Sequence, residues 1–273
     1  NMKIKDHFLS KEIFEIKETE IEGIFKTYPI PENLGKYYES KDYISHHQDS
    51  NSLKEKIYKF AQSFNLNYKR NILSSVSFEN AKVLDYGCGA GEFLKHIEND
   101  VQTFGYEPSD AARNFAKQKT TKTKFIENLN EIENGSLDVI TLWHVFEHIE
   151  NQTEILSLFY NKLKSNGHLI IAVPNCTSYD AKYYKDFWAA YDVPRHIFHF
   201  SKKGMEKFFN TENWKLEKIK PLLLDSYYIS ILSEKYKKNP LFWIFGGILG
   251  AISNIKASKN GEFSSLVYII KKI

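Results

Sequence analysis

The chain has 273 residues, of which 42% are hydrophobic, so it is long enough for one large α/β domain with additions or for two small domains. Its formal net charge of +3 is too small to indicate a polyanionic partner. Arginine, the residue preferred for phosphate and guanine contacts, occurs only at positions 70, 113 and 195, so we expect no nucleic-acid partner.

The two cysteines, Cys88 and Cys176, have no metal-ligand spacing and are too few for a disulfide framework. The first residues show no secretory signal pattern, and the most apolar run, residues 240–252, is about half as long as a membrane-spanning helix. These features predict a cytoplasmic protein without integral membrane association.

The first 50 residues contain turn signals but no regular periodicity, which predicts an irregular N-terminal arm. Aromatic and histidine side chains gather towards its end, at Tyr37, Tyr38, Tyr43, His46 and His47. Apolar residues at helical spacing from Leu53 onward then predict a helix that ends near Ser74.

A regular alternation of strands and helices begins at residue 81 and favours a parallel sheet with right-handed crossovers. Strands are predicted at Lys82–Tyr86, Gln102–Tyr106, Lys124–Ile126, Leu137–Trp143 and 168–173. Ser109 is expected to cap a helix. Apolar residues spaced from Val145 to Leu163 predict one long helix that Gly167 ends.

The pattern changes after Val173, where a long aromatic loop is expected to reach Phe200. Ser201 then caps a helix through Phe209, and strands are predicted at 214–224 and 265–270 with an apolar helical insertion between them. The predicted organisation is an N-terminal arm at 1–50, a core at 51–225, a helical insertion at 226–261 and the last strand of the core at 262–273.

Residues 83–93, Val-Leu-Asp-Tyr-Gly-Cys-Gly-Ala-Gly-Glu-Phe, form a strand that leads into a glycine turn and a helix. Glycine suits such a turn because it adopts positive φ angles and lets a ligand approach the main chain. The dinucleotide fingerprint needs a third glycine at position 92 or 94, which here are Glu92 and Leu94. The acidic flanks, Asp85 and Glu92, suit a ligand that carries positive charge.

Polar residues also follow the next predicted strands, where ligands of a parallel sheet bind. Glu107 lies 22 residues after Asp85, at the position of an acid that accepts hydrogen bonds from a ribose diol. Asn128 and Leu129 follow the third strand and are placed to bracket a nucleobase. The fourth strand ends at Trp143 and is followed by His144, Glu147 and His148.

In these segments the chain resembles the class I S-adenosylmethionine-dependent methyltransferases. The resemblance rests on residues 83–91, on Gly-Tyr-Glu-Pro at 105–108, on Leu-Asp-Val-Ile-Thr-Leu-Trp-His-Val-Phe-Glu-His at 137–148 and on 163–175. Within the family, Glu147-His148 and His199-Phe200-Ser201 are most similar to the small-molecule branch, which includes ubiquinone-pathway O-methyltransferases and sugar methyltransferases. It implies a doubly wound, mostly parallel seven-stranded Rossmann-like sheet with an antiparallel last strand.

The resemblance implies S-adenosylmethionine as the cofactor and S-adenosylhomocysteine as the product. Asp85, Gly87 and Gly89 would face the methionine portion, Glu107 the ribose hydroxyls, and Asn128 and Leu129 the adenine. Many members have Asp at the position of Asn128, and an amide oxygen still accepts from the adenine amino group. The rest of the expected cofactor site is formed by Tyr86, Pro108, Trp143 and His144.

Catalytic residues are harder to predict, because methyl transfer proceeds largely through positioning. His148 is a candidate catalytic residue, Glu147 and His148 also have the chemistry of metal ligands, and the structural alternative is a helix cap. No metal site is assigned. In the 191–200 loop, His196 and His199 are candidate bases, unless they only pack beneath the loop. Arg195 either clamps an anionic substrate group or pairs with Asp192.

The N-terminal arm would form a lid that brings Tyr43 to the substrate, or it would pack on the surface. The apolar stretch 241–252 would be buried, complete a pocket or contact a membrane. The predicted activity is methyl transfer to a small-molecule or metabolite acceptor, with O-, N- and C-methylation all open. The alternatives are a non-catalytic S-adenosylmethionine-binding module and, disfavoured by the glycine spacing, a nicotinamide oxidoreductase.

Overall fold

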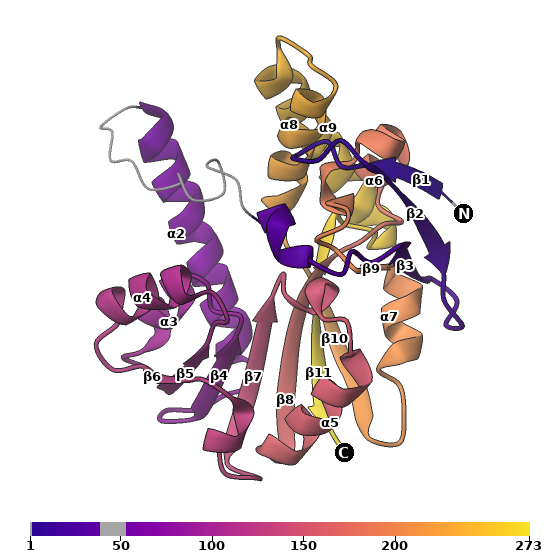
Figure 1. The fold of residues 1–273 in the computed structure, drawn as a ribbon. Coiled ribbons are helices and arrows are strands. Elements are labelled where there is room, and N and C mark those ends of the chain that lie inside the picture. Colours follow the sequence, from indigo (N-terminus) through magenta and orange to yellow (C-terminus); the bar gives the residue numbers. More distant parts are fainter. Residues whose placement is uncertain (1, 39–52) are drawn as a thin grey trace.

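The computed structural model describes residues 2–38 and 53–273, so Tyr43, His46 and His47 lie outside the described residues. Its centre is a seven-stranded sheet in the order β10-β11-β8-β7-β4-β5-β6 (Figure 1). The strands are β4 (Lys82–Tyr86), β5 (Gln102–Tyr106), β6 (Lys124–Ile126), β7 (Leu137–Trp143), β8 (Leu163–Pro174), β10 (Trp214–Pro221) and β11 (Ser265–Lys272).

The sheet is parallel from β6 through β8, and β11 runs antiparallel between β8 and β10. The chain order reverses beside β4, which pairs with both β5 and β7. This is the topological switch point, outside which open parallel sheets bind their ligands. The predicted fold class, including the antiparallel strand, is confirmed.

Apolar side chains cover both faces of this sheet because successive residues of a buried strand point to opposite sides. On one face, Val83 packs with Leu73 and Ile97 from two helices, α2 (Leu53–Ser74) and α3 (Glu92–Ile97). On the other, Leu84 shares a core with Phe159 and Met205 from α5 (Gln152–Lys162) and α7 (Lys202–Phe208). Helix α4 (Asp110–Lys119) begins at the predicted cap, where Ser109 Oγ accepts from the amide of Ala112.

The N-terminal segment forms strands rather than the irregular arm predicted from sequence. Its strands β1 (Met2–Lys5), β2 (Ile13–Glu18) and β3 (Ile24–Tyr28) pair antiparallel, and β9 (Phe198–Phe200) completes a four-stranded N-terminal sheet. A 3-10 turn, η1 (Leu34–Tyr38), follows. The segment from 174 to 200, predicted to be a long aromatic loop, also contains regular structure. Its elements are α6 (Tyr179–Tyr184), η4 (Lys185–Phe187), η5 (Ala189–Tyr191) and β9.

The predicted long helix from Val145 to Leu163 is wrong. A short 3-10 turn, η3 (Phe146–His148), follows β7, and α5 begins only after Asn151, whose side chain accepts from the amide of Glu154. Asn151 therefore starts a new helix with its own cap, which the apolar spacing alone does not reveal. Gly167 lies inside β8 and ends no helix.

The helical insertion consists of α8 (Asp225–Tyr236) and α9 (Phe242–Asn260). It shares a second core with the N-terminal sheet and the 179–193 segment, and Figure 1 shows this layer beyond the carboxyl ends of β7 and β8. Gly246 lets the two helices touch, because a Cβ there would lie 2.4 Å from Ile231 Cα.

Burial, one of the three expectations for 241–252, holds for the inner side of α9 but not for its outer side. The exposed apolar side chains there are Leu241, Trp243, Ile244, Phe245, Ile248 and Ile255. No helix in the described ranges combines the length and apolarity needed to cross a membrane.

Candidate active site

The glycine turn after β4 is built from main chain alone. Gly87, Gly89 and Gly91 all have positive φ angles, and the amides of Gly87 and Cys88 donate to the Tyr106 carbonyl at 2.8 and 3.0 Å. A Cβ on Gly87 would lie 2.5 Å from Val145 Cγ2, whereas a Cβ on Gly89 would meet no described atom within 4 Å. The Gly89 backbone thus borders open space at the sheet's carboxyl edge.

Glu107, which directly follows β5, is joined to this turn. Its Oε2 accepts from the amide of Gly89 and its Oε1 from the amide of Ser109, both at 2.9 Å. Each carboxylate oxygen has a second lone pair, so the group can also accept from a ligand. The structure therefore places the predicted ribose acid directly beside the glycine turn.

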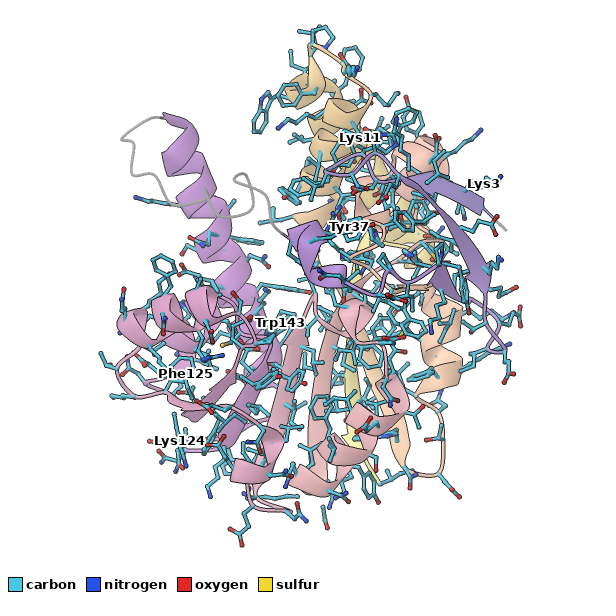
Figure 2. All side chains as sticks on the ribbon, viewed as in Figure 1. Lys3, Lys11, Tyr37, Lys124, Phe125 and Trp143 are labelled. Carbon is cyan, nitrogen blue, oxygen red and sulfur yellow. The ribbon has the colours of Figure 1, made fainter. Side chains whose placement is uncertain are left out.

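The Asp85 side chain is buried beneath the glycine turn. Thr141 Oγ1 donates to its Oδ1 at 2.6 Å, and burial raises the pKa of the Asp85 carboxyl to about 6. Lys69 of α2 opposes that rise and Glu107 adds to it. The Lys69 ammonium also lies 4.7 Å from the centre of the Trp143 ring. Trp143 is the last residue of β7, at the carboxyl edge of the sheet (Figure 2). Burial lowers the pKa of this lysine, although Asp225 and Asp85 oppose the change.

The remaining predicted cofactor residues have mixed surroundings. Tyr86 stacks on Tyr106 with ring centroids 4.5 Å apart and packs against the core, as does Leu129. The Asn128 side chain accepts from the amide of Asn130 and caps the short turn η2 (Leu129–Glu131), so the oxygen assigned to adenine already accepts one hydrogen bond. Pro108 is exposed beside Glu107.

A cavity of about 440 Å³, which we call the acceptor cavity, opens at the carboxyl ends of β7 and β8. Side chains from α8 give it an apolar wall, formed by Tyr228, Ile229, Leu232 and Tyr236. Its polar end is formed by His144, Glu147, Asp192, Arg195, His196 and Asp225. The position suits a substrate that must meet a ligand bound at the glycine turn.

His144 links two carboxylates at this polar end. Its Nε2 lies 2.8 Å from Asp225 Oδ2, and its Nδ1 lies 3.4 Å from Glu147 Oε1. Burial disfavours the charged imidazole, but Asp225 and then Glu147 outweigh it and raise the pKa of His144 to about 10. His144, predicted to bind the cofactor, thus also lines the acceptor cavity, where its two carboxylate partners favour a charged imidazole. Its positive φ of 56° turns it away from the line of β7.

The two candidate catalytic histidines, His148 and His196, lie together, with ring centroids 4.6 Å apart. His196 lines the acceptor cavity, and its Nε2 is 4.0 Å from Glu147 Oε1. Burial, with a smaller contribution from His148, lowers the pKa of His196 to about 4. His148 Nδ1 lies 2.8 Å from the Arg195 carbonyl and 3.1 Å from the Tyr38 hydroxyl.

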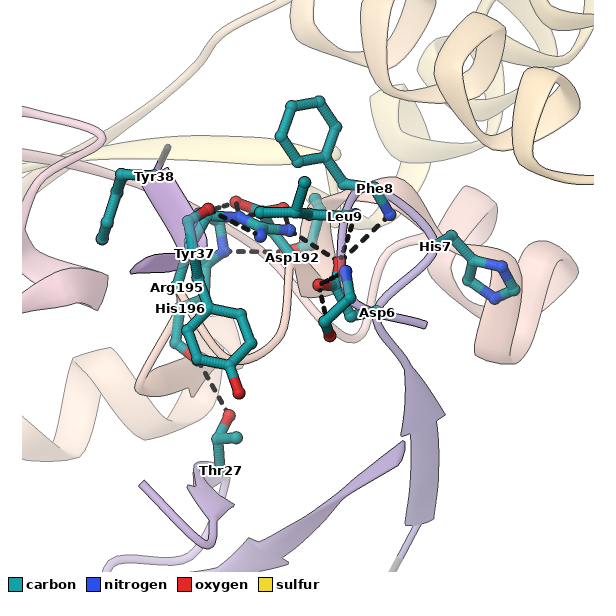
Figure 3. Close-up of polar contacts among 12 residues, drawn as sticks. Asp6, His7, Phe8, Leu9, Thr27, Tyr37, Tyr38, Asp192, Arg195 and His196 are labelled. Atoms are coloured by element: carbon teal, nitrogen blue, oxygen red, sulfur yellow. Dashed lines mark hydrogen bonds and ion pairs between the residues drawn. The ribbon is translucent and has the colours of Figure 1, made fainter. Parts of the chain in front are cut away.

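Arg195 forms the ion pair that was the alternative to a substrate clamp. Its guanidinium donates to Asp192, to Asp6 at 2.9 Å and to the Tyr37 carbonyl at 3.2 Å, and it stacks near the ring of Phe8 (Figure 3). The side chain is 1% exposed. Arg195 therefore ties the 189–196 segment to the N-terminal sheet, and its engaged donors do not support the predicted role as a substrate clamp.

His199, unlike Arg195, does not line the acceptor cavity. It lies in β9, is 4% exposed, and its Nε2 is 2.8 Å from Thr27 Oγ1. Burial holds the pKa of His199 well below its usual value. This position does not support the predicted role as a catalytic base, because the ring joins two strands of the N-terminal sheet.

Sequence reasoning missed Asp225 and Lys69. Asp225 begins α8, and an acid at a helix start is expected on electrostatic grounds alone, so its pairing with His144 gave no distinct signal. Lys69 is one lysine among many on a long helix. Lys69 is brought near Asp85 and Trp143 only because α2 packs beside the switch point.

Residues 53–219 match the family model described as a methyltransferase domain. Because the match covers more than half of the chain, together with the fold above it shows that the chain belongs to the methyltransferase-domain family. The resemblance to class I S-adenosylmethionine-dependent methyltransferases is thereby confirmed.

Two relatives and two solved structures show how far the similarity extends. An uncharacterized protein of Methanocaldococcus jannaschii is 30% identical over 176 residues, which are 60% of this chain and 66% of that protein. A ubiquinone biosynthesis O-methyltransferase of Vibrio parahaemolyticus is 30% identical over 103 residues, 34% of this chain and 44% of its own. The chain thus matches less than two thirds of each relative's length.

A Haloferax volcanii putative methyltransferase in complex with the Trm112 methyltransferase activator superposes with a TM-score of 0.56 and 15% identity, over 78% of this chain and 92% of that one. Phosphoethanolamine N-methyltransferase 2 of Haemonchus contortus, in complex with phosphomonomethylethanolamine and S-adenosylhomocysteine, gives a TM-score of 0.54 and 14% identity, over 91% and 62%. At these identities the structures support the fold alone.

Proposed function

We propose that this chain transfers the methyl group of S-adenosylmethionine to a small-molecule or metabolite acceptor. The observation that carries the proposal is the joined glycine turn and Glu107 carboxylate, next to an acceptor cavity at the same edge of the sheet. The proposed cofactor site keeps the ten predicted residues, Asp85, Tyr86, Gly87, Gly89, Glu107, Pro108, Asn128, Leu129, Trp143 and His144. The family membership and the ubiquinone biosynthesis O-methyltransferase among the similar proteins support the class.

The reaction is an in-line displacement. A lone pair of the acceptor forms a bond to the methyl carbon, the carbon–sulfur bond breaks, and its electron pair stays on the sulfur of neutral S-adenosylhomocysteine. Positioning two reactants can lower the barrier by about 7–11 kcal/mol, so the main task of the cavity is to align the acceptor and exclude water. An acceptor O–H or N–H also loses a proton, and the candidate bases are His196, which lines the cavity, and His148 beside it.

S-adenosylhomocysteine is expected to raise the melting temperature of the protein, and NAD is expected to leave it unchanged. At 100 times its dissociation constant a ligand stabilises the folded state by about 2.7 kcal/mol. Glu107→Ala should weaken binding by about 1–3 kcal/mol, because it removes an acceptor for the ribose and releases the amide of Gly89. Thermal melts with each ligand measure both effects.

The matched control is Glu133→Ala, an exposed carboxylate away from the site, which should bind like the unaltered chain. A shift with NAD but none with S-adenosylhomocysteine would overturn the proposal. Transfer of labelled methyl groups into a metabolite extract separates an enzyme from a non-catalytic binding module, which would bind the cofactor and label nothing.

Cofactor affinity should fall as the pH drops from 7 to 5. In the free protein the Asp85 pKa is raised to about 6, so below that pH the carboxyl takes up a proton and no longer attracts the ammonium group of the cofactor. The groups that face Asp85 are Thr141, Lys69 and Glu107. Isothermal titration of S-adenosylhomocysteine at several pH values measures the change, which approaches tenfold per pH unit well below pH 6.

The same raised pKa means that the free folded protein binds more protons than the unfolded chain between about pH 4 and 6. The contribution of Asp85 to stability therefore decreases as the pH rises through that window. Asp85→Asn should bind more weakly at pH 7 and lose the pH dependence. An unaltered chain whose affinity is flat from pH 5 to 7 would remove Asp85 from the site.

A further inference from the structure

Three potential metal ligands meet at the polar end of the acceptor cavity. Glu147, His148 and His196 each bring one ligand atom to within 4.8 Å of the other two. Ligands of a single ion at about 2.0–2.2 Å lie roughly 3–3.5 Å from one another, so closing the set requires shifts of about 1 Å or less in each side chain. The residues come from η3 and from the 189–196 segment, which Arg195 anchors.

Backbone carbonyls fix both histidines in the form that binds metals. His148 Nδ1 lies 2.8 Å from the carbonyl of Arg195, and His196 Nδ1 lies 2.9 Å from the carbonyl of Ala190. A carbonyl only accepts, so each Nδ1 carries a hydrogen, and in the neutral ring the lone pair is then on Nε2. A hydrogen bond of this kind, from the nitrogen that does not bind the ion, is the usual support of a metal-binding histidine.

The Glu147 carboxylate supplies the independent observation. The residue is 0% exposed, and neither of its oxygens accepts a hydrogen bond from any described residue. Its nearest polar hydrogen donor is the His144 ring, with Nδ1 3.4 Å away, and its other neighbour is His196 Nε2 at 4.0 Å. The His144 imidazole partly offsets the burial of this carboxylate, but neither carboxylate oxygen accepts a hydrogen bond from the described part of the chain, and both lie where two further imidazoles converge.

We propose that Glu147, His148 and His196 bind one divalent transition-metal ion, of the class of Zn²⁺, Mn²⁺, Fe²⁺ or Co²⁺, with open positions that face the acceptor cavity. Two imidazoles and one carboxylate suit these ions, whereas Mg²⁺ and Ca²⁺ prefer oxygen ligands. The cavity is lined by two of the three ligands, Glu147 and His196, so a bound ion borders the space that an acceptor would occupy.

The role of the ion rests on the proposed function and narrows it to a hydroxyl acceptor. The ion would lower the pKa of a hydroxyl group bound at its open position, and that hydroxyl would release its proton to water. The oxygen lone pair then forms the bond to the methyl carbon as the carbon–sulfur bond breaks. Metal, oxygen and methyl group would thus meet between the cavity and the glycine turn.

The test is a Co²⁺ titration of chelator-treated protein, followed by visible absorption and by calorimetry. We expect one equivalent to bind with visible absorption bands, and Glu147→Gln, His148→Gln and His196→Gln each to weaken binding at least tenfold. His168→Gln is the matched control, because His168 forms a histidine–carboxylate pair with Glu217 outside the cavity. His148 and His196 are only partly buried, so both histidine variants are expected to fold.

Melting temperature and S-adenosylhomocysteine binding keep the outcomes distinct. Co²⁺ should raise the melting temperature of the unaltered chain and of His168→Gln but of none of the three ligand variants. The absence of stoichiometric binding, or equal binding by the ligand variants, would overturn the metal site. If the ligand variants still bind S-adenosylhomocysteine, the proposed function stands whatever the result for the metal. If the unaltered chain does not bind S-adenosylhomocysteine, the proposed function fails, independently of the metal site.

Discussion

Replacing Arg195 by methionine is expected to lower the free energy of unfolding by about 3–5 kcal/mol. Removing one partner of a buried ion pair leaves the other charge in the interior without compensation. In this protein the charge left without its partner is the Asp6 carboxylate, and Asp6 is 1% exposed. Burial opposes its charge, but Arg195 and the amides of the 8–10 turn hold the pKa of Asp6 below its usual value.

Urea unfolding of Arg195→Met against Arg70→Met measures this effect. Arg70 pairs with Asp100 at the surface, where both side chains are at least 40% exposed, and such pairs contribute about 0–1 kcal/mol. If Arg195 instead served mainly as a substrate clamp, its variant would unfold like the control and lose only activity. A loss of stability below 1 kcal/mol would therefore contradict the structural role.

Alanine at Gly87 is expected to abolish cofactor binding and to destabilise the fold by roughly 1–3 kcal/mol. The residue has a φ of 80°, and the new Cβ would lie 2.5 Å from Val145 Cγ2, so the turn or the start of the 145–148 segment has to shift. Both segments border the proposed reaction centre. Thermal melts and S-adenosylhomocysteine titration of the variant measure the two effects.

Gly89→Ala and Gly135→Ala form a matched pair for the same test. Their φ angles are 54° and 63°, and a Cβ at either position meets no described atom within 4 Å, so both substitutions carry a similar backbone strain of about 1 kcal/mol. Gly135 lies in the turn before β7, away from the site. Only Gly89→Ala should weaken S-adenosylhomocysteine binding, because its methyl group enters the space assigned to the cofactor. Equal affinities would place the cofactor elsewhere.

The central strands were predictable because their signals are local. Each of β4 to β7 is a short segment with apolar or aromatic residues between polar or turn residues, and all four have the predicted bounds. The N-terminal sheet was not predictable in the same way. Its strand β3 pairs with β9, so Ile24 contacts Phe200, which is far away in the sequence. β3 has five residues and β9 has three, and neither is distinctive alone.

The candidate site likewise contains some contacts that the sequence predicts and others that depend on pairing between distant segments. The contact between Glu107 and the glycine turn follows from strand order, which the sequence reveals. The burial of Arg195 and His199 depends on the missed N-terminal sheet, because their partners Asp6 and Thr27 belong to it or to its first turn. The break in the predicted long helix likewise places Glu147 and His148 in a short turn beside His196.

A crystal structure of the protein with S-adenosylhomocysteine tests the central claim most directly. The account predicts the nucleoside in the open space beside Gly89, with its ribose hydroxyls on Glu107 and its amino-acid end towards Asp85. A dinucleotide-shaped ligand retained at the turn, or a turn left empty at saturating S-adenosylhomocysteine, would contradict it.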